Sequence, residues 1–353
     1  MSDYPFLDPQ LRTADRLPIR TTSLAMLDLD KVAAHIAKAV KLGRYHSSVE
    51  PLEYLLLKQC VVPVEEEQYA TLAGILCFGH DPQAIFPSAV VDIGHYRGEE
   101  AISFEVVNIE KNIGGTIFDQ LNRIKEYLKR NTHTGMILRD QGFERIEVPD
   151  YPLAVIRELG VNMLAHQDYT LVGSVARVLL FRDRIEWISP GGLLPGVRIK
   201  DILDTQNSRN PVIQSILYEA GYVEALGQGL DTVVKVLREE KMQEAVFKDI
   251  GTAFIVKVFG REHKDLEQYD YVPLSEIQKR IVNVIRARGE ASLDELDRAL
   301  SDRAKRTIQA DLDRLIEANI VERIGQTRAT RYHLKKVTGT KLPTAASDVS
   351  RQE

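Results

Sequence analysis

The sequence predicts an α+β protein of several domains, and three observations support this fold class. Its 353 residues exceed the size of most single domains. Apolar residues recur at helical spacing in some segments and alternate at strand spacing in others. Residues 274–336 hold 14 Lys and Arg against 10 Asp and Glu, a balance of +4, which leaves −9 for the rest of a chain of net charge −5. A basic C-terminal module of this kind would attract DNA.

Composition excludes several protein classes. Hydrophobic residues at 44% and charged residues at 27% are ordinary for a globular protein. No apolar run approaches about 18 residues and the start lacks a secretory signal, so we expect a cytoplasmic protein without a membrane segment. Cys60 and Cys77 lie in apolar stretches and are expected as buried thiols without a structural zinc. Motifs of metalloproteases, P-loop NTPases and α/β-hydrolases do not occur.

The N-terminal part is predicted as an arm followed by an α/β region. Residues 1–25 contain prolines and little periodicity, so we expect an extended arm that lies on a partner surface. In the α/β region, residues 26–145, Gly43 is expected to end a helix over 27–42. The other elements predicted up to residue 149 are a helix over 52–59, a helix-to-strand or strand element over 69–78, a strand over 90–96, a long helix over 113–131 and a short strand over 144–149.

Residues 151–230 contain the most specific pattern in the chain. A helix is predicted after Pro152, and it places Glu158 and Asn162 four residues apart on one face, with His166 one turn further. A β-hairpin over 175–181 and 184–189, helices over 212–219 and 230–240, and a strand over 253–259 follow. The remaining motifs of the pattern are Asp168, Gly191-Gly192, Ser208-Arg209-Asn210-Pro211, Gly227 and Gly229. Together they outline a nucleotide–magnesium pocket.

The order of these motifs resembles the C-terminal domain of RecG-related ATP-binding proteins and transcriptional regulators, which are distant relatives of the GHKL ATPases such as gyrase and histidine kinases. The resemblance covers roughly residues 20–260 and implies a two-layer α/β sandwich over residues 146–260 that binds ATP and magnesium. It implies that Glu158 polarises the attacking water and that Asn162 holds the magnesium. The nucleotide-binding residues implied are Asn162, His166, Asp168, Gly191, Gly192, Gly227 and Gly229.

Two positions depart from the family pattern, and each motif has a simpler interpretation. Gln167 replaces an arginine of the family, and Ser189-Pro190 stand where GHKL proteins read adenine with an aspartate. Glu158 and Asn162 could also be the polar flank of an ordinary helix. Asn210-Pro211 would serve equally as a helix N-cap followed by a first-turn proline. The glycines could serve only turns that need positive φ.

The C-terminal module, residues 273–336, is predicted to follow a linker over 261–272 and to precede a disordered tail over 337–353. Helices are expected over 274–288, 293–300 and 303–318, and strands over 320–324 and 332–334. This order resembles a winged helix-turn-helix. Lys305, Arg306 and Gln309 would then lie on the recognition helix, with Arg328 and Arg331 on the wing, all contacting double-stranded DNA. A module used only for dimerisation or protein docking is the alternative.

These predictions lead to three hypotheses for the function, of which the first is the leading one. The first is a cytoplasmic, homodimeric, DNA-binding transcriptional regulator whose nucleotide site biases the position of the winged helices. The second is the ATPase subunit, a GHKL-type ATP hydrolase, of a DNA-processing or phage-defence complex. Many relatives carry an N-terminal Schlafen-type AlbA-like domain, and from the resemblance we expect that this domain has either been lost here or is supplied by a partner protein. The third is a non-catalytic scaffold with a degenerate pocket.

Overall fold

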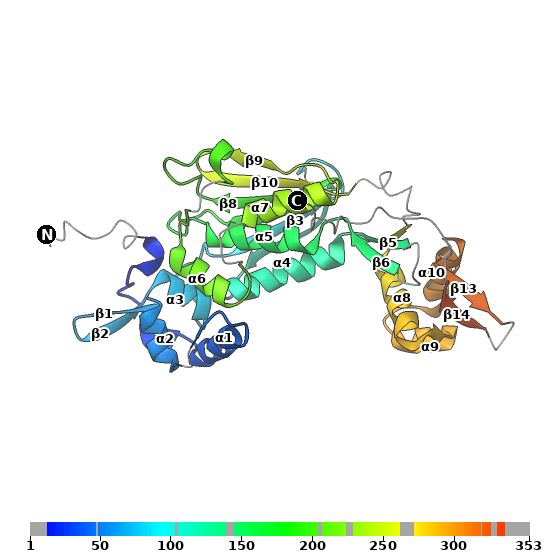
Figure 1. The fold of residues 1–353 in the computed structure, drawn as a ribbon, viewed down its shortest axis with the longest axis horizontal. Helices are drawn as coiled ribbons and strands as arrows, with labels where there is room; N and C mark the ends of the chain where they lie inside the picture. The colour runs from blue at the N-terminus through cyan, green and yellow to red at the C-terminus, as the bar shows by residue number, and fades with distance from the viewer. Residues whose placement is uncertain are drawn as a thin grey trace, which may run out of the picture. The chain divides into compact units, whose positions relative to one another are not determined.

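The computed structural model describes residues 13–46, 49–102, 105–138, 145–203, 207–223, 229–261, 272–318, 320–325 and 330–335 (Figure 1). It divides into two compact units. Unit 1 comprises Met1–Lys129 and Tyr151–Gly260, and unit 2 comprises Arg130–Asp150 and Arg261–Glu353. The expected tail over 337–353 and most of the expected linker lie outside the described residues.

Unit 1 contains a mixed sheet with strand order β4-β3-β7-β8-β10-β9 in its described part. Only β3 and β7 pair in parallel, and the other neighbours pair antiparallel. The strands are β3 (Val91–Tyr96), β4 (Val106–Ile113), β7 (Ala176–Leu180), β8 (Arg184–Pro190), β9 (Val246–Asp249) and β10 (Ala253–Phe259). The predicted α+β class is therefore confirmed, as is the hairpin over β7 and β8.

Three helices lie along one face of this sheet (Figure 1). They are α4 (Ile117–Asn131), α5 (Leu153–Ala165) and α7 (Gly229–Glu239). Gly160 of α5 packs against α4 and the sheet, because a Cβ there would lie 3.5 Å from both Leu121 and Trp187. The remaining helices of unit 1 are η2 (Ala14–Arg16), η3 (Leu24–Met26), α1 (Leu29–Lys41), α2 (Pro51–Leu57), α3 (Leu72–Phe78), η4 (Pro82–Ala84), η6 (Ile199–Asp201) and α6 (Pro211–Glu219).

Two predictions differ from the structure: the segment 69–78 is a strand followed by a helix and not a helix-to-strand or strand element, and the helix expected from residue 113 begins later. The segment 69–78 is the end of β2 (Glu67–Ala70), which pairs with β1 (Val61–Val64), and then α3, whose N-cap Thr71 accepts from the backbone N–H of Gly74. The helix expected from residue 113 begins only at residue 117. Residues up to Ile113 extend β4, and Gly115, at φ +84°, makes the turn between them.

A single hydrophobic core joins the two regions that the sequence separates at residue 145. Val32 and Phe78 from the first region belong to the same buried cluster as Trp187 and Val258 from the second. Residues 130–150 group instead with unit 2, where β5 (Thr134–Leu138) pairs with β6 (Arg145–Pro149) and β11 (Val272–Leu274). The N-terminal α/β region thus contributes two strands to the sheet that supports the predicted pocket.

Unit 2 also contains a small helical module. Its helices are α8 (Glu276–Arg288), α9 (Leu293–Ala299) and α10 (Lys305–Glu317), and its sheet has the order β12 (Glu290–Ala291), β14 (Arg331–Leu334), β13 (Val321–Ile324). Capping boxes begin α8 at Ser275 and α9 at Ser292. The amide of Gln278 donates to the buried Asp311 carboxylate at 3.0 Å and links α8 to α10.

Two composition-based expectations can be examined in the described residues. None of the helices there is long and apolar enough to cross a bilayer. Cys60 and Cys77 are free and buried, and burial raises the pKa of both thiols. They are therefore inert core residues, as predicted.

Candidate functional site

A cavity of about 270 Å³ opens in unit 1 between α5, α7 and the sheet. Most of the predicted nucleotide residues line it, namely Glu158, Asn162, His166, Gly191, Gly192 and Gly229. Asp168 is not among the lining residues. Gly227 lies outside the described residues. These six residues, which lie between positions 158 and 229 of the sequence, are therefore brought together in the wall of one cavity.

Helix α5 supplies the acidic and amide groups of the cavity. Pro152 occupies the N-cap position rather than the first helical residue, and Ile156 N–H donates to its carbonyl at 3.1 Å. Glu158 is only 3% exposed, and Arg157 pairs with its Oε1 at 2.7 Å. A buried carboxylate is costly unless it is paired. The interpretation of Glu158 as the solvated flank of an ordinary helix is therefore wrong.

The first residue of α7 contacts this part of α5 closely. A Cβ on Gly229 would lie 2.8 Å from Asn162 Nδ2 and 3.1 Å from Glu158 Oε2. Glycine suits this approach, which brings the first described residue of α7 next to the carboxylate and the amide. Asn162 Nδ2 is buried and has no hydrogen-bond partner within the described part of the chain.

These groups fit a phosphate–magnesium moiety. The unpartnered Asn162 amide and the α7 N-terminus are suited to phosphate oxygens. No group of three His, Cys, Asp or Glu side chains that could hold a metal occurs among the described residues. Magnesium commonly takes one or two protein ligands and completes its coordination with water and substrate phosphates. Asn162 would be the protein ligand in such an arrangement.

The Gly191–Gly192 loop has a steric need for both glycines. Gly191 adopts φ +91°, and a Cβ there would lie 2.7 Å from Asp168 Cβ. At Gly192 a Cβ would lie 2.7 Å from the carbonyl oxygen of Gly251. Asp249 accepts from the backbone N–H of Leu193 at 3.3 Å and fixes the exit of the loop. Both glycines also line the cavity. The loop therefore needs glycine for its backbone conformation and at the same time forms part of the cavity wall.

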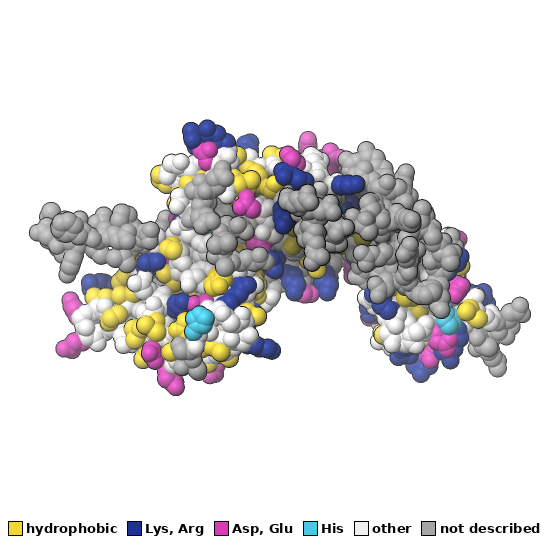
Figure 2. Space-filling model, in the orientation of Figure 1, with side chains coloured by type: hydrophobic (Ala, Val, Ile, Leu, Met, Phe, Trp, Pro, Cys, Tyr) yellow, Lys and Arg dark blue, Asp and Glu magenta, His cyan; other side chains and the backbone are white. Residues whose placement is uncertain are grey.

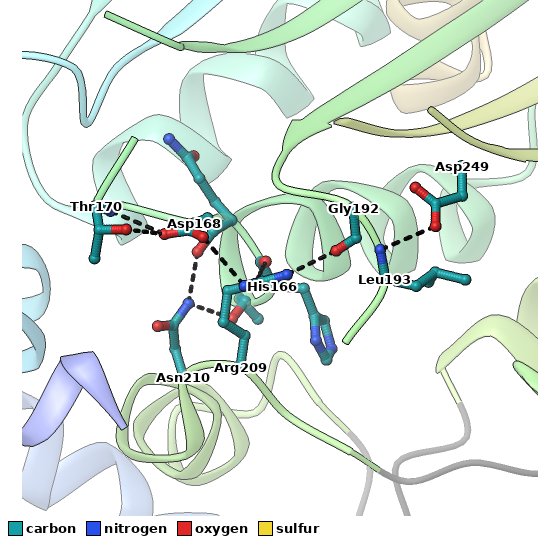
Figure 3. A network of polar contacts seen from close by, with 10 residues as sticks. His166, Asp168, Thr170, Gly192, Leu193, Arg209, Asn210 and Asp249 are labelled. Atoms are coloured by element: carbon teal, nitrogen blue, oxygen red, sulfur yellow. Dashed lines mark hydrogen bonds and ion pairs between the residues drawn. The ribbon is translucent and has the colours of Figure 1, made fainter. Parts of the chain in front are cut away.

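Arg209 and Asn210, which belong to the predicted 208–211 motif but received no individual pocket role from the sequence, tie this wall together (Figure 3). Arg209 donates from Nε to the His166 carbonyl at 3.1 Å, from Nη1 to Asp168 at 3.2 Å and from Nη2 to the Gly192 carbonyl at 2.6 Å. Asn210 Nδ2 donates to the carbonyls of Ala165 and Gln167 at 3.0 and 2.8 Å. We call these two residues the Arg209–Asn210 clamp. It joins the end of α5 to the glycine loop.

The clamp overturns one interpretation of the Asn210-Pro211 pair. Pro211 is the first residue of α6, as expected, but the Asn210 side chain makes no cap hydrogen bond to that helix. Asp15 takes this place, since its Oδ2 accepts from the backbone N–H of Val212 at 2.7 Å and of Ile213 at 3.3 Å. The cap of α6 thus comes from the predicted N-terminal arm.

His166 and Asp168 differ in their relation to the cavity. Burial and the adjacent charge of Arg209 lower the pKa of His166 to about 4, so its imidazole is neutral at pH 7. Asp168 accepts from Arg209 and from the hydroxyl and N–H of Thr170 at 2.6 and 3.0 Å. Asp168 therefore organises the loop after α5 and does not face the cavity.

Most of the rest of the wall is apolar, but Asn207, Gln214 and Asp231 are polar members of it, and so is Ser189. The Ser189 hydroxyl donates a hydrogen bond to the Met163 carbonyl at 2.7 Å, so its proton is already engaged by the α5 backbone. Two aromatic side chains, Trp187 and Phe254, contribute to the wall. The aliphatic lining is Leu159, Met163, Leu193, Leu194, Val197, Ile202, Leu203, Val223, Leu230 and Val256. Such a wall suits the planar face of a base.

The predicted DNA-binding residues of unit 2 are mostly paired with acidic neighbours. Lys305 pairs with Asp294 of α9, and Arg331 donates to Glu295 at 2.6 Å. Gln309 donates to Asp313 at 2.8 Å. Arg306 is exposed and has no hydrogen bond or ion pair among the described residues. Arg328 lies outside them.

The surface of unit 2 is accordingly mixed in charge. Figure 2 shows basic and acidic side chains interspersed over α8 and α9. Many of the 14 basic side chains in this module are therefore paired with acidic side chains of the protein itself, and the net balance of +4 already counts those acidic partners.

Comparisons with known proteins agree with the location of the cavity. A family model described as "Putative ATP-dependent DNA helicase recG C-terminal" matches residues 173–258, which include β7, β8, the glycine loop and α7. No curated protein matches the chain. The DIP2311 protein of Corynebacterium diphtheriae has a similar fold, with a TM-score of 0.55 and 16% identity. The match covers 91% of this chain but only 64% of that protein, and it speaks for the fold alone.

Proposed function

We propose that unit 1 binds a nucleoside triphosphate with magnesium, and that the chain is a DNA-binding regulator that senses this nucleotide. One observation carries the nucleotide part. The N-terminus of α7 meets Glu158 and Asn162 inside the same cavity that the Gly191–Gly192 loop closes. The match of residues 173–258 to the RecG C-terminal model supports an ATPase-like domain at this place.

The residues have distinct roles in this proposal. Asn162 would hold magnesium, which when bound neutralises phosphate charge. The N–H groups of α7 would receive the phosphate oxygens. Glu158 would orient a water molecule and accept its proton if the site hydrolyses its ligand. Trp187 and Phe254 would pack against the base.

Calorimetry and thermal unfolding with Mg-ATP test the nucleotide part. A ligand at 100 times its dissociation constant raises the free energy of unfolding by about 2.7 kcal/mol. Asn162→Ala should abolish most of this gain, whereas Glu158→Gln should retain binding and lose any turnover. An unchanged melting curve and no binding heat at millimolar Mg-ATP would refute the nucleotide proposal. Binding without turnover in the wild type would favour a sensor or scaffold over an ATPase subunit.

The DNA part rests on the order of helices and strands in unit 2. Three helices followed by the β13–β14 hairpin correspond to a winged helix-turn-helix, with α10 as the recognition helix. Arg306, in its first turn, is exposed and unpaired among the described residues, and can reach a guanine edge or a phosphate. A homodimer would recognise a palindromic site on double-stranded DNA. Selection from random duplexes tests this, and the absence of any motif would favour a docking module or a partner that supplies the DNA contact.

A further inference from the structure

The beginning of α6 is the joint between the N-terminal segment and the cavity. Asp15, fully buried, caps this end from 197 residues away through Val212 N–H at 2.7 Å. The two residues just before the helix form the Arg209–Asn210 clamp, whose five hydrogen bonds fix the end of α5, Asp168 and the Gly192 carbonyl. A shift of this helix end would therefore move the cavity wall.

The opposite end of α6 has an independent anchor. Glu219 accepts from Tyr54 at 2.6 Å, lies 3.3 Å from His35 Nε2, and pairs with Lys58. These partners come from α1 and α2. Loss of the Asp15 contact would thus free the beginning of α6 while its end remains held, so the helix would tilt rather than detach.

The joint is poorly saturated with hydrogen bonds. Eight buried side-chain nitrogen and oxygen atoms of the described residues have no partner, and five of them belong to the three segments that meet here. They are atoms of Thr13, Asp15, Arg16, Gln167 and Ser208. An unsatisfied buried polar group costs about 1–3 kcal/mol. The hydrogen bonds that Asp15, Arg209 and Asn210 do make therefore carry the positioning of the joint.

We propose that Asp15 is a positioning residue of the nucleotide cavity, acting through the beginning of α6 and the Arg209–Asn210 clamp. This inference rests on the proposed nucleotide function for its affinity readout but not for its ligand-free one. It assigns to the N-terminal segment a part in forming the site, although none of the residues described there, from residue 13 on, lines the cavity.

The variants Asp15→Ala and Asp15→Asn test whether the hydrogen bond that Asp15 accepts from Val212 positions the cavity. A control variant separates this effect from the general loss of stability when a helix cap is removed. The asparagine keeps an oxygen that accepts from Val212, so it should behave like the wild type, whereas alanine removes the acceptor. Asp28→Ala is the matched control. Asp28 caps α1 by accepting from Asp30 and Lys31 N–H, both at 3.1 Å, but does not line the cavity. Its loss should lower stability without changing the cavity.

Trp187, the single tryptophan of the chain, reports directly on the wall because it is 2% exposed and lines the cavity. Without ligand, Asp15→Ala should shift the Trp187 emission and increase its quenching by acrylamide, and Asp28→Ala should change neither. With Mg-ATP as the probe, Asp15→Ala should weaken binding tenfold or more, about 1.4 kcal/mol, and Asp15→Asn should restore it.

The outcomes separate the two hypotheses. If the wild type binds no Mg-ATP, the proposed function fails, and the ligand-free emission still decides the role of Asp15. If the wild type binds and Asp15→Ala has the same affinity and emission, the positioning role is refuted. If Asp15→Ala does not fold, Asn210→Ala can be used instead, because it removes the hydrogen bonds between the start of α6 and the end of α5. Wild-type Trp187 emission and wild-type Mg-ATP affinity in Asn210→Ala would overturn the proposal.

Discussion

Gly229→Ala should separate the stability of unit 1 from its capacity to bind a nucleotide. Alanine favours a helix over glycine by up to about 1 kcal/mol, and by less at a helix end. The added methyl would lie 2.8 Å from Asn162 Nδ2, well inside ordinary contact distance. The Asn162 amide must therefore move by at least about half an ångström, and misplacement of about 1 Å in a site can cost a hundredfold. We expect Mg-ATP affinity to fall about tenfold to a hundredfold while the fold persists.

Gly160→Ala is the matched control, because it adds the same methyl to α5 without a clash. Its Cβ would lie 3.5 Å from both Leu121 Cδ2 and Trp187 Cζ3, an ordinary contact distance. This variant should gain about 0.5–1 kcal/mol of stability, since an interior helical glycine is replaced. Its Mg-ATP affinity should equal that of the wild type.

Urea unfolding and isothermal titration calorimetry with Mg-ATP would test this pair. Wild-type affinity in Gly229→Ala would refute the idea that phosphate binds against Asn162 and Glu158. A loss of stability in Gly160→Ala would instead refute the steric argument. A parallel loss of affinity in both variants would indicate a general effect of crowding around the cavity.

Three further outcomes follow from the same contacts. Because Ser189 is spent on the Met163 carbonyl, ATP and GTP should bind within about tenfold of each other in competition calorimetry, and a strong adenine preference would reveal another acceptor. The pKa of His166 is lowered to about 4 by burial and then by Arg209, so stability present above pH ~6.5 should fall as the pH drops toward 4. His166→Gln should flatten that decline in urea unfolding at pH 7 and pH 4.5, and an unchanged slope would contradict it. In DNA-binding titrations Arg306→Ala should weaken binding more than Lys305→Ala, since Lys305 is paired with Asp294, and equal effects would argue against this ranking.

Regular periodicity made much of the fold predictable. Helices α7 and α10 each have a buried and a polar face, and β7 and β8 are joined by a short turn, so their patterns were visible. Helix α3 was not recognised because all of its residues are buried and leave no alternation. The short strands β5, β9 and β12 were missed, since two to five residues give too weak a pattern.

The candidate site was predictable only where its geometry follows local spacing. Glu158 and Asn162 share a helical face, so their proximity could be read from four residues of separation. The approach of Gly229 to both depends on how α7 packs on α5, and no spacing encodes that. What the sequence did offer was a glycine at the start of a helix, which indicates a close approach but not its partner.

The contacts made by Arg209, Asn210 and Asp15 explain why the remaining part of the site was hidden. Each of these side chains bonds backbone groups of distant segments, and backbone groups look the same at every residue. Any sequence at positions 192 or 167 would present a carbonyl, so no complementary residue type marks the pairing. For the same reason, each of these hydrogen bonds is sensitive to substitution only at the residue that contributes its side chain. Substitutions at Arg209, Asn210 and Asp15 should therefore affect the cavity, whereas conservative changes of side chain at Gln167 or Val212 should leave these hydrogen bonds intact.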